Sequence, residues 1–129
     1  MTTILVVDDE PLIAMALQAA LEDEGYQVVT AANGKQGLER LAEAPRPELV
    51  LLDMMMPVMN GPAMLKAMAA DRNLGSIPVI VLSSLPEEAV LARTTGVALI
   101  LRKPYTVHSV LSAIVQVLDE PHNPHNPLA

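Results

Sequence analysis

The segment Leu49-Val50-Leu51-Leu52-Asp53, four apolar residues followed directly by a carboxylate, decides the predicted fold of this chain. A short, continuous run of apolar residues is typical of a strand that is buried on both faces of a parallel sheet. Comparable runs occur at residues 4–7, 79–82 and 97–101, and residues 26–30 form a further strand candidate. We therefore expect five strands, spread over almost the whole length of the chain.

Apolar residues recur at helical spacing in the segments that separate these strands. Pro11 suits the first turn of a helix and Gly25 its C-terminal stop, while Leu38 and Leu41 lie on a second helix after the turn signal at residues 33–34. Three further helices are expected: residues 62 to about 72, a helix with a capping box of Ser84 and Glu87 that runs to about residue 95, and a last helix that Thr106 caps and that ends near residue 118. The alternation predicts an α/β fold, a doubly wound five-stranded parallel sheet with helices on both faces.

Length and composition limit the class of protein. The chain has 129 residues, 51% of them hydrophobic and 18% charged, which suits one folded domain with a substantial core. Its 15 acidic and 8 basic residues give a formal net charge of −7, which argues against a nucleic-acid partner, because phosphate neutralisation requires clustered Lys and Arg. No apolar run reaches the roughly 18 residues of a membrane helix, so no membrane partner is expected. The absence of cysteine fits a reducing compartment, and we expect a cytoplasmic protein.

The end of the chain differs in composition from the rest. Residues 119–129 repeat Pro-His-Asn at 121–123 and 124–126 and have no apolar periodicity. We expect one domain over residues 1–118 and a disordered tail over residues 119–129. This tail is too short for an effector domain, so a stand-alone domain is expected.

Polar side chains follow the ends of four predicted strands. Asp8 and Asp9 follow the first strand, Asp53 the third, Ser83 the fourth, and Lys103 the fifth. Ligands of an open parallel α/β sheet bind at the carboxyl ends of its strands. We therefore expect three carboxylates, a hydroxyl and an ammonium to meet at one edge of the sheet.

These residue types together suit a phosphoryl group and a hard cation. Three neighbouring carboxylates repel one another unless a positive charge joins them, and Mg²⁺ prefers oxygen ligands. Lys103 adds a fixed positive charge, Ser83 adds a neutral donor, and the central Asp53 has a carboxylate that can act as a nucleophile. Each residue alone has a simpler explanation: Asp53 or Ser83 can cap a helix, and Lys103 can be an ordinary solvated lysine. That all of these simple explanations hold at the ends of four strands is improbable.

Four segments of the chain resemble the receiver domains of bacterial two-component response regulators, and the stand-alone chemotaxis regulators among them. The segments are residues 6–10 (VVDDE), 52–61 (LDMMMPVMNG), 78–84 (PVIVLSS) and 103–105 (KPY). The resemblance covers residues 3 to about 118. It implies a flavodoxin-like fold with strand order 2-1-3-4-5.

The resemblance also implies a role for each candidate site residue. Asp53 would accept a phosphoryl group from a phosphohistidine on a sensor histidine kinase or a histidine phosphotransferase. Ser83 would hydrogen-bond that group, Lys103 would pair with it, and the Lys103–Pro104 bond would be cis. Mg²⁺ would be the cofactor, and its protein ligands would be Asp8, Asp9, Asp53 and the backbone carbonyl of Met55.

The sequence departs from the family pattern at three positions. Ile100 stands in the fifth strand where the family usually has an aromatic switch residue, so we expect rearrangement to centre on Ser83 and the loop after it. Met55 and Leu85 are apolar where the family often has polar residues. Because neither side chain orients a water well, we expect the phosphoryl group on Asp53 to be long-lived. The neighbouring run of methionines at residues 54–56 is interpreted as loop packing rather than as partner-binding surface.

The predicted function is signalling rather than catalysis for a separate substrate. The domain would catalyse its own phosphoryl transfer and slow dephosphorylation, and would signal by binding an output protein when phosphorylated. The resemblance places output, or a possible homodimer, at the fourth helix, fifth strand and last helix. Two alternatives remain: a pseudo-receiver that only mediates interaction or dimerisation, and an enzyme with an aspartyl-phosphate intermediate. Such enzymes usually place nucleophile and acid two residues apart, whereas Asp8 and Asp9 are adjacent.

Overall fold

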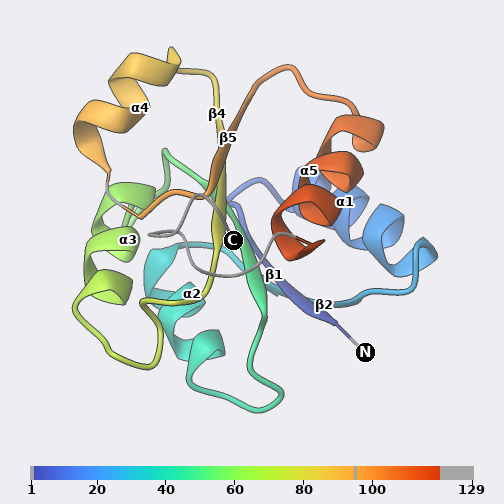
Figure 1. The fold of residues 1–129 in the computed structure, drawn as a ribbon, viewed down its shortest axis with the longest axis horizontal. Helices are drawn as coiled ribbons and strands as arrows, with labels where there is room; N and C mark the ends of the chain where they lie inside the picture. The colour runs from blue at the N-terminus through green and yellow to red at the C-terminus, as the bar shows by residue number, and fades with distance from the viewer. Residues whose placement is uncertain (1, 95, 120–129) are drawn as a thin grey trace.

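A computed structural model describes residues 2–94 and 96–119 of the chain. Strands and helices alternate along these residues (Figure 1). The elements, in chain order, are β1 (Thr3–Val7), α1 (Pro11–Asp23), β2 (Gln27–Ala31), α2 (Gly34–Leu41), β3 (Leu49–Asp53), α3 (Gly61–Ala69), β4 (Val79–Ser83), α4 (Glu87–Arg93), β5 (Leu99–Arg102) and α5 (Val107–Asp119).

The five strands form one parallel sheet in the order β2-β1-β3-β4-β5. The predicted fold class and strand order are therefore confirmed. Every residue of the three inner strands, β1, β3 and β4, is buried, as expected for continuous apolar runs covered on both faces. The register pairs Asp53 with Leu82 and Ser83 with Arg102, so the polar ends of neighbouring strands come out at the same edge.

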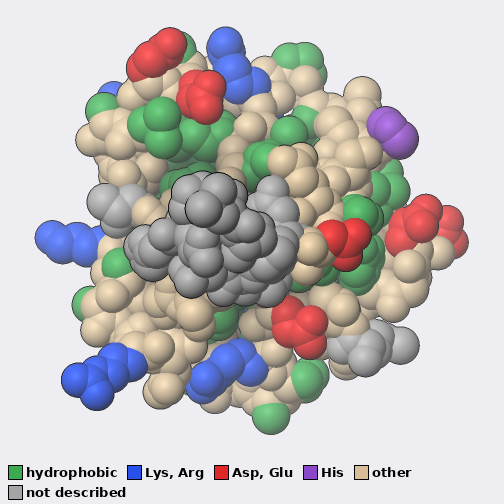
Figure 2. Space-filling model, in the orientation of Figure 1, with side chains coloured by type: hydrophobic (Ala, Val, Ile, Leu, Met, Phe, Trp, Pro, Cys, Tyr) green, Lys and Arg blue, Asp and Glu red, His purple; other side chains and the backbone are tan. Residues whose placement is uncertain are grey.

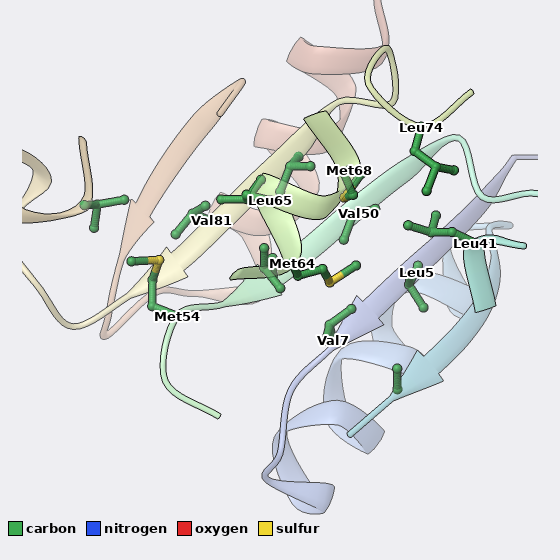
Figure 3. Packing of buried hydrophobic residues seen from close by; sticks show 14 residues of the cluster. Leu5, Val7, Leu41, Val50, Met54, Met64, Leu65, Met68, Leu74 and Val81 are labelled. Atoms are coloured by element: carbon green, nitrogen blue, oxygen red, sulfur yellow. The ribbon is translucent and has the colours of Figure 1, made fainter. Parts of the chain in front are cut away.

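The sheet divides the hydrophobic core into two clusters. Helices α1 and α5 cover one face, and α2, α3 and α4 cover the other (Figure 1). On the second face, methionines supply much of the contact: Met54, Met64 and Met68 pack among leucines and valines such as Val81 and Leu41 (Figure 3). With only two tyrosines and no Phe or Trp in the chain, flexible thioethers fill the space that aromatic rings often fill.

Local hydrogen bonds at the helix ends follow the sequence signals. Asn33 and Asn60 cap α2 and α3, each side chain accepting a backbone N–H three residues later at 2.9 Å. Thr106 and Ser109 form reciprocal side-chain to backbone bonds of 3.0 Å at the start of α5, so the cap predicted at Thr106 is confirmed. Gly25, at a φ of 93°, follows the end of α1 as expected for a glycine stop.

The expected capping box of Ser84 and Glu87 is wrong. Helix α4 begins at Glu87, its N-cap is Pro86, and no side chain caps it. The loop instead uses the preceding serine, because the Oγ of Ser83 accepts the backbone N–H of Leu85 at 3.0 Å. Val90 is the one buried residue that the structure describes in this helix.

Several predicted element boundaries also differ from the structure. Helix α3 ends at Ala69 rather than near residue 72, α4 ends at Arg93, and β5 begins at Leu99 rather than at residue 97. Arg102, which lies beyond the strand predicted at residues 97–101, is the last residue of β5. The tail expected to be disordered lies outside the described residues, except for Asp119, which ends α5.

Charged side chains are dispersed over the face of the molecule in Figure 2. Lysines and arginines lie apart from one another around the margin of this face rather than in one cluster. Within the described ranges, no helix combines the length and the apolar character that crossing a membrane requires.

Candidate functional site

Asp53 is the last residue of β3 and the centre of the site. The residue is nearly buried, at 6% relative exposure. Both hydrogen bonds that the structure gives this carboxylate go to one oxygen: Oδ1 accepts the backbone N–H of Met54 at 2.9 Å and the Nζ of Lys103 at 3.2 Å. The second oxygen, Oδ2, is thereby left for another partner.

Asp8 lies beside Asp53, directly after β1. Its backbone N–H donates to the carbonyl of Ala31 at 3.0 Å, which anchors it to the end of β2. Its Oδ1 accepts the backbone N–H of Glu10 at 2.9 Å, but its buried Oδ2 has no hydrogen-bond partner within the described residues. Burial raises the pKa of the Asp8 carboxyl, and the negative charge of Asp53 adds to this effect, whereas the bond from Glu10 and the charge of Lys103 oppose it.

The three carboxylates fit a metal ion. Asp8, Asp9 and Asp53 each offer an oxygen, and these atoms all lie within 4.8 Å of one another. A buried oxygen without a donor costs free energy, and three carboxylates at this spacing repel one another. A cation held by these oxygens would relieve both costs, and the structure brings together the three carboxylates of the predicted donor set.

Lys103 lies in the loop after β5, opposite the carboxylates. Its backbone N–H donates to the carbonyl of Ser83 at 2.8 Å, which ties this loop to the end of β4. Burial by itself lowers the pKa of the ammonium, but the charge and the hydrogen bond of Asp53 outweigh burial, so the pKa is raised. Lys103 therefore stays protonated, and the expected cis bond to Pro104 is present.

Ser83 completes the edge at the end of β4. The residue is 1% exposed, and its Oγ accepts the N–H of Leu85 within the β4–α4 loop. As an acceptor in that bond, the hydroxyl keeps its own proton for donation. The serine predicted for the site is thus adjacent to Asp53 in the sheet, and in this structure its hydroxyl oxygen is bonded to the N–H of Leu85.

The loop from β3 to α3 is held against the site by close packing that the sequence analysis did not identify. The N–H of Gly61 donates to the carbonyl of Met54 at 3.0 Å. A Cβ added to Gly61 would lie 2.6 Å from the carbonyl oxygen of Asp53 and 2.9 Å from the Cα of Met54. The turn signal at residues 60–61 could have indicated this close approach, because glycine is the residue that permits it.

Val58, in the same loop, has a strained backbone. Its φ is +67°, in the left-handed region that a β-branched residue rarely occupies. The N–H of Met59 donates to the carbonyl of Pro57 at 2.7 Å, so Val58 is the centre of a γ-turn of the rarer, strained kind. Its side chain is 79% exposed and gains little from packing.

Replacing Val58 with Asn is expected to raise the free energy of unfolding by about 1 kcal/mol, because asparagine tolerates positive φ. Val58→Thr keeps the β-branch and serves as the matched control, with unchanged stability. Urea denaturation of the three proteins measures the difference. Equal midpoints for the Asn and Thr variants would show that the strain has no effect on stability.

The amino-acid sequence matches the response regulator receiver domain family over residues 4–115. The chain belongs to this family. Among its relatives, the protein PilH of Pseudomonas aeruginosa is 36% identical over 120 residues, which are 92% of this chain and 98% of PilH. The alkaline phosphatase synthesis transcriptional regulatory protein PhoP of Bacillus subtilis is 34% identical over 117 residues, 89% of this chain and 48% of PhoP. The receiver domain thus spans nearly all of PilH and about half of PhoP.

Solved structures of receiver domains have the same fold. The receiver domain of a signal transduction histidine kinase from Syntrophus aciditrophicus matches with a TM-score of 0.85 and 30% identity, covering 100% of this chain and 99% of the other. The chemotaxis protein CheY4 of Vibrio cholerae matches with a TM-score of 0.81 and 29% identity, covering 91% of this chain and 98% of the other. The protein is accordingly a response regulator receiver of two-component signalling, a function that rests on phosphoryl acceptance.

Three departures from the family pattern take definite positions in this receiver domain. Ile100 and Leu85 are both half-buried and pack against the same core cluster, on the face covered by α2, α3 and α4. Met55, two residues past Asp53, is instead 67% exposed, so the interpretation of residues 54–56 as loop packing holds for Met54 and Met56 and is wrong for Met55. Of the three apolar residues, Leu85 and Ile100 therefore stabilise the core near β4 and β5, whereas Met55 faces solvent near the carboxylates.

Proposed function

We propose that Asp53 is the residue that accepts the phosphoryl group, from a phosphohistidine on a sensor histidine kinase or a histidine phosphotransferase. The observation that carries this proposal is that the two oxygens of its carboxylate differ in their hydrogen bonds. Oδ1 holds the N–H of Met54 and the Nζ of Lys103, which fixes the orientation of the group and leaves Oδ2 as the nucleophile. An oriented nucleophile is the main requirement of phosphoryl transfer, which depends on positioning and on electrostatics.

In the transfer step, Oδ2 of Asp53 attacks phosphorus from the side opposite the histidine nitrogen. The new O–P bond forms as the P–N bond breaks, and the imidazole leaves with the electron pair of that bond and takes up a proton. The product is an acyl phosphate on Asp53. Lys103, already 3.2 Å from the carboxylate, stays near enough to pair with the transferred oxygens.

The acidic residues beside Asp53 would hold Mg²⁺. The proposed ligands are carboxylate oxygens of Asp8, Asp9 and Asp53 and the backbone carbonyl of Met55. The buried, unpartnered Oδ2 of Asp8 supports this assignment. When bound, the cation supplies positive charge to the phosphoryl oxygens.

Ser83 would report the arrival of the phosphoryl group to the β4–α4 loop. To donate its hydroxyl proton to a phosphoryl oxygen, Ser83 has to turn toward Asp53, and the N–H of Leu85 then loses its acceptor. Since α4 begins only two residues later and has no side-chain cap, the start of this helix would move with the serine. Output, or a homodimer contact, is proposed for the surface of α4, β5 and α5 on this ground.

An apolar rim around the site would receive the phosphohistidine partner. The rim consists of four exposed side chains in or directly after the loops at the carboxyl end of the sheet: Leu12, Met55, Val58 and Val107, with exposures of 81%, 67%, 79% and 48%. Exposed apolar groups around a charged centre are typical of protein interaction sites. Their burial by a partner would also exclude water from the transferring group.

Beryllofluoride, a phosphoryl mimic, is expected to stabilise the protein only when Mg²⁺ is present. At a hundredfold excess over its Kd, it should add about 2.7 kcal/mol to the free energy of unfolding. Differential scanning calorimetry with and without Mg²⁺ measures the effect, and fluoride with Mg²⁺ but without beryllium is the control. Stabilisation of the same size in EDTA, or in a variant with Asp8→Ala and Asp9→Ala, would refute the metal assignment.

A further inference from the structure

The methionines of the described chain fall into sharply different environments. Met54, Met64 and Met68 are at most 3% exposed, and Met56 and Met59 are half-buried against the core. Met15 and Met55 are instead 63% and 67% exposed. A dissolved oxidant therefore reaches the sulfurs of Met15 and Met55 first.

Only one of these two accessible sulfurs is near the phosphorylation site. Met55 is two residues past Asp53, so their Cα atoms are at most about 7 Å apart. Its side chain has three rotatable bonds and is largely exposed, so packing does not hold the thioether away from the solvent side of the Asp53 carboxylate. Met15 lies in the second turn of α1, whose neighbouring residue Ala14 packs into the core on the other face of the sheet.

We propose that Met55 is an oxidation site, and that its conversion to methionine sulfoxide shortens the lifetime of the phosphoryl group on Asp53. The proposal rests on the proposed phosphorylation of Asp53. The oxidant is a peroxide: its O–O bond breaks, one oxygen forms the S=O bond, and with hydrogen peroxide the other oxygen leaves as water. The sulfur loses two electrons and the peroxide gains them.

The effect on lifetime follows from the change in hydrogen bonding. Hydrolysis requires a water that attacks phosphorus opposite the bond to Asp53, which means from the solvent side of the site. In that step the water oxygen bonds to phosphorus, the bond to Asp53 breaks, and the carboxylate is released with inorganic phosphate. The thioether of Met55 accepts hydrogen bonds weakly, whereas a sulfoxide oxygen accepts them well and can orient the attacking water.

The structure provides a matched control for the experiment. Met15→Leu leaves Met55 as the accessible sulfur near the site, and Met55→Leu removes it while keeping a side chain of similar size and polarity. Both proteins are treated with hydrogen peroxide, the position of oxidation is mapped by peptide mass spectrometry, and acetyl phosphate then supplies phosphate at saturating Mg²⁺. After the donor is removed, the loss of phosphoprotein is followed over time.

Oxidation is expected to speed the loss of phosphate about threefold to tenfold in Met15→Leu, which is the rate equivalent of one added hydrogen bond. The rate of phosphate loss in Met55→Leu should be the same before and after treatment with peroxide. A second variant, Met55→Gln, places a carbonyl oxygen there without any oxidant and should decay faster than the untreated protein. Equal acceleration in Met55→Leu, or unchanged decay of both oxidised Met15→Leu and Met55→Gln, overturns the proposal. A protein that takes up no phosphate before oxidation would instead refute the phosphorylation of Asp53.

Discussion

Replacing Asp53 with Asn is expected to abolish covalent phosphorylation. The amide nearly matches the carboxylate in size and keeps an oxygen that can accept the N–H of Met54, so the loop retains its anchor. Its oxygen and nitrogen are poor nucleophiles, and no acyl phosphate forms. Intact-protein mass spectrometry after incubation with acetyl phosphate and Mg²⁺ measures the loss.

The control for this experiment is Asp23→Asn, an exposed carboxylate at the C-terminal end of α1, whose N-terminal end is the one that follows Asp8 and Asp9. This variant should take up phosphate as the unmodified protein does. Normal phosphate stoichiometry in Asp53→Asn would mean that another residue is the acceptor. The melting temperatures of Asp53→Asn and of the unmodified protein are measured alongside. If they are equal, the variant is folded and has lost only its capacity to accept phosphate.

Replacing Gly61 with Ala is expected to destabilise the protein by about 1–3 kcal/mol, the usual range for overpacking a filled site. The new methyl group would meet the backbone of Asp53 and Met54 at 2.6 Å and 2.9 Å, and backbone atoms cannot rotate away as a side chain does. Because the displaced atoms belong to the proposed phosphorylation site, the rate of phosphorylation should fall as well. Thermal unfolding and the uptake of phosphate from acetyl phosphate measure the two effects.

Gly75→Ala is the matched control, because its added Cβ would have no neighbour nearer than 3.4 Å, from the carbonyl of Asp71. It should leave phosphorylation intact and change stability little. If Gly61→Ala melts at the same temperature as Gly75→Ala, the loop between β3 and α3 relaxes without cost, and the close approach at Gly61 does not hold the site.

The fold was predictable because the buried inner strands consist of continuous apolar runs that are visible in the sequence. Runs such as residues 49–52 leave no polar residue to face water, which favours a strand covered on both sides. The site followed from the same pattern, since the first polar residue after such a run lies at the sheet edge. Asp8, Asp53 and Ser83 were found in this way, and each is buried.

The remaining features depend on contacts that a local pattern does not express. Ser84 and Glu87 have the spacing of a capping box, but the side chain of Ser83 takes the loop N–H and α4 begins after Pro86. Val58 has a conformation that its residue type disfavours, so propensity predicts the opposite of what the structure has. The unpartnered oxygen of Asp8 depends on burial by the folded chain, which the residues next to Asp8 in the sequence do not reveal.

Helix α4 has a consequence for how receivers of this kind can diverge. Its seven residues contribute one buried side chain, Val90, to the core, while Leu91, Ala92 and Arg93 are exposed. Most of its surface residues can therefore be substituted with little loss of stability in the sheet that carries the carboxylates. With the output surface proposed at α4, a duplicated gene can acquire a new downstream partner through changes in this helix, while the carboxylates of the proposed phosphorylation site stay the same.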